Sequence, residues 1–277
     1  MRRKALLVLA AAVLLGAAAW AICGLVSSIQ DRSEQDTIFE RLRKISTEDV
    51  PTDLGFYSSG NEDSSYTESS TASAAEPEAY SNVAPEEIQG HNIFILQEEN
   101  PDCVGWVTIQ GTDIDYPVMY SPDDPEYYLD HSFEKTQNRH GVPFLDSRCN
   151  VETCDNLLIY GHHFVEGEMF STLHKYTSYS FYEDHPVITL ETAEGISEYK
   201  IAAVLKASGT ATSARWSIFN SLYMDEEAFA EMVSELESQA LYTTGVTPVF
   251  GDRLLTLATC EYSQKNGRLA VVAVKEQ

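Results

Sequence analysis

The sequence predicts a mostly β protein, a sandwich or a barrel with flanking helices, behind one N-terminal transmembrane helix. Eight short runs of β-type composition recur between residues 104 and 275, with turn residues between them. A long uncharged apolar run lies near the N-terminus. An acidic segment poor in large apolar residues separates these two parts of the 277-residue chain.

The N-terminal run has the length and the flanks of a membrane anchor. Residues 1–4 contain three basic side chains, and the 22 residues from Ala5 to Val26 carry no charge. At 1.5 Å per residue this run crosses a hydrocarbon core of about 30 Å. We therefore predict an anchor over residues 5–28, with residues 1–4 in the cytoplasm and the rest of the chain outside. A cleaved signal peptide is the alternative, although this run exceeds the usual apolar core of one.

Residues 29–81 are predicted to form a juxtamembrane segment and a stalk. Residues 30–47 have a helical pattern, with Ile38, Leu42 and Ile45 on one side. Residues 48–87 then contain ten acidic side chains and no basic one. Such a segment buries too little apolar surface to fold and repels itself, so we expect a disordered, extended stalk that holds the next domain away from the membrane.

The catalytic or binding domain is predicted to span residues 82–277. A helical segment over the middle of residues 84–102 opens it, and it is broken at Asn100-Pro101. The predicted strands follow at residues 104–109, 113–119, 141–146, 156–162, 186–192, 198–207, 253–260 and 268–275. A short helix is expected at 167–176 and a longer one at 224–241, where Phe229, Met232, Val233 and Leu236 recur at helical spacing.

Charge and cysteine content exclude several classes of function. The formal net charge of −25 argues against a nucleic-acid partner, which needs a basic surface. The five cysteines show neither CxxC pairs nor the Cys/His spacing of a zinc site. Cys149 and Cys154 flank a turn, "CNVETC", and either stay as packed thiols or form a disulfide outside the cell.

A cysteine and an arginine face each other across the last predicted hairpin. Cys260 ends the run "RLLTLATC", and Arg268 opens the run "RLAVVAVK" after an Asn-Gly turn. If the two runs are antiparallel neighbours, the simplest register places Cys260 opposite Arg268. A guanidinium favours a thiolate and also reaches an oxyanion formed on a bound substrate.

A nucleophilic cysteine also needs a group that handles protons, and the histidines supply one candidate. In "NLLIYGHH" an apolar strand runs directly into Gly161, His162 and His163, and His162 continues the strand. The other five histidines lie in polar or loop-like surroundings and are expected to be solvated: His91, His131, His140, His174 and His185.

These residues resemble the sortases, and within them class B. "TLATC" followed by Arg268 resembles the TLxTC…R signature, and "IYGH" resembles the strand that carries the histidine. Further similar stretches are "NPDCVGWVTIQGTDIDYPVM", "EYYLDHSF", "GVPFLDSRC" and "NLLIYGHHFVEGEMFSTLHKY", with the helical run at 224–241 similar to the class B insertion before the cysteine strand. The resemblance covers about Ala84 to Lys275. Two positions depart from the class B pattern, since Ala258 stands where serine is frequent and His163 where asparagine is expected.

The resemblance implies a closed β-barrel of about eight strands and a membrane-anchored cysteine transpeptidase of Gram-positive bacteria. Such an enzyme cleaves an NPxTN or NPxTG sorting motif after threonine, and it passes the substrate protein to an amine on a peptidoglycan precursor or a pilin lysine. It implies Cys260 as nucleophile, His162 as general acid and base, and Arg268 as oxyanion or substrate-positioning residue. No cofactor and no metal are implied.

Three further residues are candidates for substrate binding. They are Ala258, Thr259 and Glu261, the last through its backbone N–H, which follows the nucleophile directly. Two alternatives stay open: a sortase of another class that acts on LPxTG-type motifs, and a non-enzymatic membrane-tethered adhesin or sensor.

Overall fold

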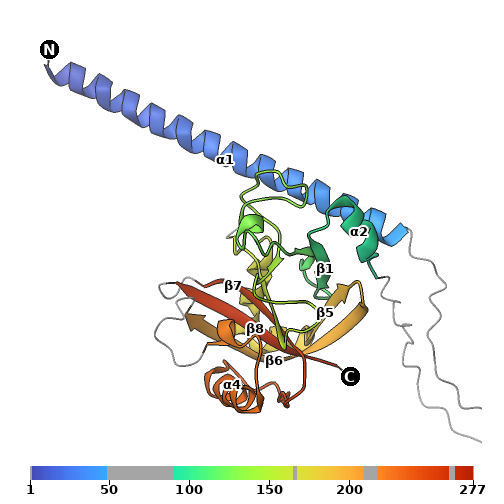
Figure 1. Ribbon diagram of the computed structural model, residues 1–277. Coiled ribbons are helices and arrows are strands. Elements are labelled where there is room, and N and C mark those ends of the chain that lie inside the picture. The colour runs from blue at the N-terminus through green and yellow to red at the C-terminus, as the bar shows by residue number, and fades with distance from the viewer. Residues whose placement is uncertain (1, 49–89, 165–166, 209–216, 262–265, 277) are drawn as a thin grey trace, which may run out of the picture.

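The chain folds into one closed β-barrel beside a long N-terminal helix (Figure 1). The computed structural model describes residues 2–48, 90–164, 167–208, 217–261 and 266–276. Within these residues eight strands follow one another around the barrel in the order β1-β2-β3-β4-β7-β8-β6-β5. The strands are β1 Cys103–Thr108, β2 Asp115–Met119, β3 Phe144–Leu145, β4 Asn156–Tyr160, β5 Val187–Thr192, β6 Gly195–Ser208, β7 Leu254–Glu261 and β8 Gly267–Lys275. The predicted fold class is confirmed.

Strand β7 lies between β4 and β8 and is almost fully covered. It pairs parallel with β4 and antiparallel with β8, whereas most other neighbours in the barrel are antiparallel. All its residues are buried except Cys260, which is partly exposed. A continuous apolar run is typical of a strand covered on both faces, and "LLTLATC" has that composition. The fold thus opens this strand to solvent at its cysteine.

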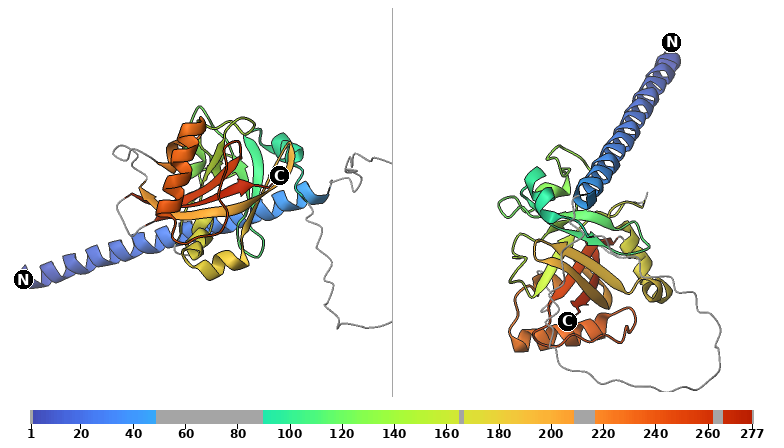
Figure 2. Two further views of the ribbon diagram at one scale, coloured as in Figure 1. Left: turned by 90° about the horizontal axis from the view of Figure 1, so that it is seen from below. Right: turned by 90° about the vertical axis from the view of Figure 1, so that its right-hand side faces the viewer.

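The N-terminal helix α1 (Arg2–Glu48) is continuous through the predicted anchor and the predicted juxtamembrane segment. Its side chains from Val13 to Val26 are exposed, and the helix is long and apolar enough to cross a membrane. Figures 1 and 2 show this part projecting away from the barrel, with the N-terminus far from every strand.

The last third of α1 packs on the barrel. Ile38, Phe39 and Leu42 are buried in the same apolar core as the strands. The Gln35 side-chain amide donates to the Gly141 carbonyl at 2.8 Å. The predicted helical face is therefore confirmed at Ile38 and Leu42, while Ile45 is partly buried against the core. The predicted domain start at residue 82 leaves out this contribution to the core.

One hydrogen bond between the two ends of the acidic segment bears on its predicted role as a spacer. Residues 49–89 lie outside the described residues, so the expected disorder and the domain limits remain predictions. The residues on either side of the segment meet, however, since the Asn92 backbone N–H donates to the Ser46 carbonyl at 2.9 Å. A segment that starts and ends at one place on the barrel does not separate the barrel from α1.

Short helices surround the barrel. They are α2 Ile93–Glu99, η1 Tyr127–Leu129, η2 Phe170–Thr177, α3 Tyr179–Asp184, η3 Ile218–Asn220 and α4 Glu226–Gln239. The helix expected at 167–176 is the 3₁₀ helix η2, which begins three residues later. Helix α4 is the predicted long insertion; Asp225 caps it by accepting from Ala228 N–H at 2.9 Å. It covers the side of the barrel opposite α1 (Figures 1 and 2).

Candidate active site

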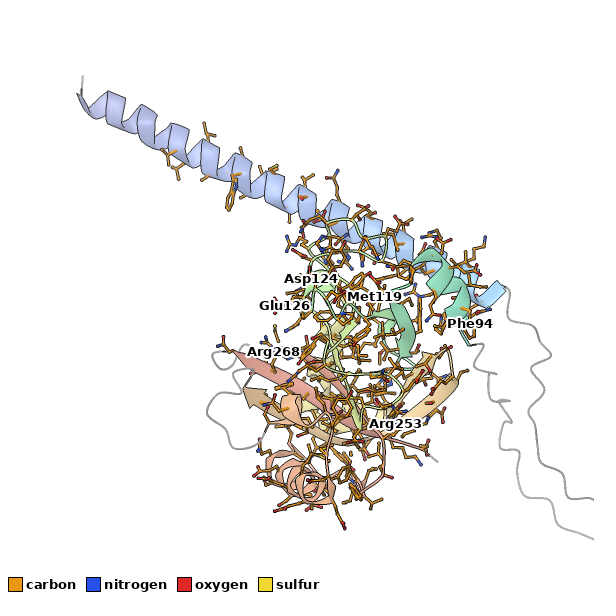
Figure 3. The ribbon with its side chains drawn as sticks, viewed as in Figure 1. Phe94, Met119, Asp124, Glu126, Arg253 and Arg268 are labelled. Carbon is orange, nitrogen blue, oxygen red and sulfur yellow. The ribbon has the colours of Figure 1, made fainter. Side chains whose placement is uncertain are left out.

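Cys260 and Arg268 are direct neighbours across β7 and β8. The two residues are partners in the antiparallel register, which confirms the register predicted for this hairpin. The Arg268 guanidinium donates from Nη1 to the Gly267 carbonyl at 3.1 Å. Figure 3 shows Arg268 at one end of strands β7 and β8 and Arg253 at the opposite end. Cys260 and Arg268 therefore lie together at one end of the barrel.

His162 lies on the other side of Cys260 because β4 and β7 are parallel. In their register Tyr160 is opposite Ala258, and each chain continues two residues to His162 and Cys260. The Gly161 N–H extends this pairing by donating to the Ala258 carbonyl at 3.1 Å. Adjacent strands lie about 4.8 Å apart. His162, Cys260 and Arg268 therefore form a row at the same end of three neighbouring strands.

The backbone that carries His162 is held on both sides. A Cβ atom on Gly161 would lie 2.6 Å from the ring of Phe170, so only glycine permits this close packing. The Phe170 N–H donates to the His162 carbonyl at 2.9 Å. The imidazole is thereby presented from a fixed backbone, although it stands just beyond the end of β4.

The ring of His162 has a defined hydrogen-bonding state. Its Nε2 lies 2.6 Å from the carbonyl oxygen of Leu129. A carbonyl only accepts, so Nε2 carries hydrogen and donates, which leaves Nδ1 without hydrogen in the neutral ring. Burial lowers the pKa of His162; the Leu129 hydrogen bond opposes this, and the nearby His140 adds to the lowering. The neutral ring is thus favoured near neutral pH.

A second pair of histidines, His163 and His174, lies at the backbone of Cys260. The His174 Nε2 donates to the Cys260 carbonyl at 2.8 Å, and the His174 ring stacks on His163 with 4.0 Å between centroids. Burial lowers the pKa of His163, and His174 adds to this. His162 therefore continues the direction of β4 beside Cys260. His163 instead stacks on His174, which binds the Cys260 carbonyl. The expectation that His174 is solvated was wrong.

Comparison with known proteins agrees with this geometry. The Sortase domain family matches residues 107–276. Sortase B of Listeria monocytogenes is 34% identical over 179 residues, covering 64% of this chain and 70% of the relative. The crystal structure of Clostridium perfringens sortase B superposes with a TM-score of 0.61 at 29% identity, covering 66% of this chain and 99% of the other. A Staphylococcus aureus sortase B–substrate complex gives 0.60 at 28% identity, covering 67% and 85%.

The chain belongs to the sortase family. Its relatives and structural neighbours support class B, so the resemblance seen in the sequence is confirmed. The protein is a cysteine transpeptidase of the sortase type. This overturns the alternative of a non-enzymatic adhesin or sensor.

Two of the predicted substrate-binding residues of this sortase are covered. Ala258 is fully buried, and Thr259 is 2% exposed. The Thr259 hydroxyl donates to the Gly161 carbonyl at 2.8 Å, which ties β7 to the histidine strand. Both side chains are covered in this structure, because β7 is covered on both faces. A contact between these residues and a substrate remains a prediction, while the Thr259 hydroxyl joins β7 to the segment that carries His162.

The side chain of Glu261 is not open to a substrate. Its side chain is buried and pairs with Lys206, with Nζ and Oε1 3.1 Å apart. The role of its backbone N–H as an oxyanion donor remains a prediction. Among the residues described, no group of three or more His, Cys, Asp or Glu side chains is arranged to hold a metal ion.

Proposed function

We propose that this sortase is a membrane-anchored class B transpeptidase that cleaves an NPxTN- or NPxTG-like sorting motif after threonine. The observation that carries the proposal is the row of His162, Cys260 and Arg268 at one end of β4, β7 and β8. Class B relatives support the motif class, and one structural neighbour is described as a complex with its substrate. The substrate is then the C-terminal sorting signal of a surface protein.

Cys260 forms and breaks the covalent bond to the substrate. Its thiolate attacks the carbonyl carbon of the motif's threonine, and the tetrahedral intermediate collapses to a thioacyl-enzyme. The leaving amine needs a proton, which His162 supplies after taking it up on Nδ1. An incoming amine then attacks the thioacyl carbon and loses its proton to the same nitrogen. The product is a new amide bond, and Cys260 is regenerated.

Arg268 stabilises the negative charge that develops on the substrate carbonyl oxygen. One guanidinium nitrogen already donates to Gly267, which orients the group, while a guanidinium carries five N–H donors in total. The backbone N–H of Glu261 is the second proposed donor. Neither cofactor nor metal takes part in these steps.

The proposed placement of the enzyme follows from α1. The span lies in the membrane with the basic residues 1–4 in the cytoplasm, and the barrel lies outside the cell. There it meets the proposed acceptor, an amine on a peptidoglycan precursor or a lysine of a pilin.

The first test uses a soluble variant that lacks residues 1–28 and so retains the part of α1 that packs on the barrel. The protein is incubated with NPQTN-, NPKTG- and LPETG-type peptides, with and without an amine acceptor. Mass spectrometry is expected to show cleavage after threonine of the NP-type peptides, a thioacyl adduct on Cys260, and an amide product when the amine is present.

Matched variants sharpen this test. Cys260→Ala should form no adduct, whereas Cys103→Ala, which removes a buried thiol away from the site, should retain activity. Arg268→Lys should lower kcat/KM by about 100-fold, because it removes an oxyanion donor of fixed geometry. Cleavage of the LPETG-type peptide alone would keep the chemistry and overturn the motif class. Cleavage without any amide product would indicate a hydrolase.

A further inference from the structure

A pair of buried thiols lies outside the catalytic row. Cys149 and Cys154 stand in the turn between β3 and β4, with their Sγ atoms 3.1 Å apart. They are 1% and 0% exposed, respectively. Two sulfurs at this separation need to approach by only about 1 Å to reach the length of a disulfide bond.

Hydrogen bonds of the backbone between Cys149 and Cys154 hold the two cysteines close together. The Cys154 N–H donates to the Asn150 carbonyl at 2.9 Å, which closes a helical turn. The side-chain oxygen of Asn150 accepts from the N–H groups of Glu152 and Thr153 at 2.9 and 3.1 Å. The turn is therefore preorganised for a bond between the two cysteines.

Two carbonyl oxygens hold the Cys154 side chain in place. Its Sγ lies 3.1 Å from the Asn156 carbonyl and 3.3 Å from the Leu222 carbonyl. These contacts keep the Cys154 sulfur beside that of Cys149.

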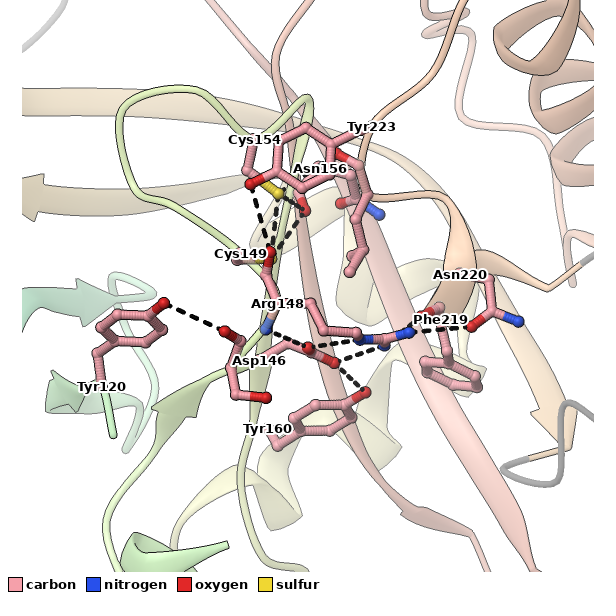
Figure 4. A network of polar contacts seen from close by, with 12 residues as sticks. Tyr120, Asp146, Arg148, Cys149, Cys154, Asn156, Tyr160, Phe219, Asn220 and Tyr223 are labelled. Carbon is pink, nitrogen blue, oxygen red and sulfur yellow. Dashed lines mark hydrogen bonds and ion pairs between the residues drawn. The ribbon is translucent and has the colours of Figure 1, made fainter. Parts of the chain in front are cut away.

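The turn connects two parts of the protein that are far apart in sequence (Figure 4). The Arg148 guanidinium donates to the Phe219 carbonyl at 2.7 Å and also pairs with Asp146. The Asp146 carboxylate accepts from the Tyr160 hydroxyl at 3.1 Å, and Tyr160 ends the strand that leads to His162.

The same turn holds the segment that leads into α4. The Cys154 thiol contacts the Leu222 carbonyl at 3.3 Å, and the Asp155 N–H donates to that carbonyl at 2.9 Å. The Asn150 N–H donates to the Tyr223 hydroxyl at 3.1 Å. A covalent bond in this turn would therefore fasten the histidine strand and the connection before α4 at one point.

We propose that Cys149 and Cys154 form an intrachain disulfide in the mature protein, which staples the turn between β3 and β4. The proposal rests on the proposed position of the barrel outside the cell, where disulfides persist. It adds a modification site that the transpeptidase reaction does not use.

The oxidant is an external disulfide, either of low molecular weight or in a thiol–disulfide oxidoreductase. The exchange takes place before folding covers the turn, because the two sulfurs are 1% and 0% exposed in the folded protein. The thiolate of one cysteine attacks a sulfur of the external disulfide, forms a mixed disulfide and releases one thiolate. The other cysteine loses its proton to solvent and attacks the first cysteine's sulfur, which releases the second thiolate. Two protein thiols are oxidised, and one external disulfide is reduced to two thiols.

The test maps the thiols of the full chain in its own membrane. Intact cells are first treated with a thiol reagent that does not cross membranes, then lysed in acid, and free thiols are alkylated in denaturant without reductant. Digestion after arginine and lysine places both cysteines on the peptide from Cys149 to Lys175. This peptide should carry no alkyl group and be lighter by two hydrogen atoms than the reduced peptide. Cleavage after Glu152 should leave its two parts joined until reductant is added.

The outcomes separate this proposal from the proposed function. Cys260 is partly exposed and should be labelled on intact cells if the barrel is outside. A reduced Cys149–Cys154 pair in a protein whose Cys260 is labelled overturns the disulfide alone. A reduced pair with unlabelled Cys260 overturns both the disulfide and the extracellular position. None of these readings depends on peptide cleavage.

A second measurement does not require that a cysteine variant fold well. Reductant should lower the Tm of the soluble protein by about 4–8 °C, as expected for a short closed loop in a domain of this size. The same reductant should leave the Tm of a Cys149→Ala/Cys154→Ala variant unchanged. Cys103→Ala is the matched control, and it should keep the full response. An unchanged Tm of the parent protein overturns the proposal.

Discussion

At the scale of single residues, the proposed reaction depends on the charge state of His162. Burial lowers its pKa, and its Nε2 hydrogen is committed to the Leu129 carbonyl. At neutral pH the ring is therefore largely uncharged, with Nδ1 free of hydrogen. In the proposed mechanism this nitrogen first accepts the proton of the Cys260 thiol and then returns it to the leaving amine.

The lowered pKa gives a prediction about pH. In a Cys260→Ala variant, the imidazole signals of His162 should titrate below about pH 6.5, the value of an unstructured histidine. Nuclear magnetic resonance at stepwise pH measures this directly. A midpoint at or above the value of a histidine in an unfolded peptide would contradict the role assigned to burial. His174→Asn is the matched control, and it should leave the His162 midpoint low.

The same shift has a consequence for stability, and its sign follows from linkage. The unfolded chain binds a proton at His162 at higher pH than the folded chain does. This contribution to the free energy of unfolding is therefore complete above about pH 6.5 and is lost as the pH falls toward the folded pKa. Urea unfolding at several pH values should show a shallower acid loss for His162→Asn than for the parent.

The sequence was sufficient to place His162, Cys260 and Arg268 at one end of neighbouring strands, because these positions depend on local patterns. Strand alternation and an Asn-Gly turn place Cys260 opposite Arg268, and a single apolar strand leads to His162. The sequence failed for His140 and His174, which were expected to be solvated. The Nδ1 of His140 pairs with Glu168, and His174 binds a carbonyl 86 residues away. Partners this distant along the chain leave no local signal.

At the scale of elements, the existence of the strands was easier to predict than their extent. The predicted run at 141–146 contains only a two-residue strand, β3. Strand β3 is short because it pairs with β2 at only one position and with β4 at only two positions. Strand β6, in contrast, runs over 14 residues, since it pairs with β5 along one part and with β8 along most of its length. Pairing partners set these limits, and a single run of residues does not contain them.

Helix α1 provides the prediction at this scale. Phe39 is 2% exposed, and its ring lies 5.2 Å from that of Tyr116 on β2. In the soluble variant lacking residues 1–28, Phe39→Ala should lower the free energy of unfolding by about 2–4 kcal/mol, because it leaves a cavity between helix and barrel. Urea unfolding measures the loss. Glu40→Ala changes the exposed neighbouring residue and should stay within about 0.5 kcal/mol of the parent. Equal stabilities for the two variants would show that α1 does not belong to the folded domain.

At the scale of the whole molecule, the length of α1 bears on the proposed position of the barrel relative to the membrane. A helix of 47 residues is about 70 Å long, and a membrane span uses about 20 of its residues. The turns from Asp31 onward contact the barrel, through the Asp31 carbonyl, Gln35 and the buried residues Ile38, Phe39 and Leu42. In the proposed arrangement the barrel therefore stands close to the membrane surface. The described residues on either side of the acidic segment, Ser46 and Asn92, meet on the barrel, so we expect α1 to set the distance between span and active site.

Shortening the acidic segment tests this arrangement. Replacing residues 51–88 by a six-residue Gly/Ser linker should preserve the fold, since the Ser46 carbonyl and the Asn92 N–H already meet. A shorter loop costs less closure entropy, so the free energy of unfolding should rise by about 1 kcal/mol.

In vesicles, cleavage of a membrane-tethered NP-type substrate by the shortened enzyme should remain within about twofold of the parent, because the distance from the span to Cys260 is set by α1. A scrambled segment of unchanged length and charge is the matched control. Loss of cleavage of the tethered substrate, with cleavage of a soluble peptide retained, would show that the segment does act as a spacer and that α1 leaves the barrel in the membrane-bound enzyme.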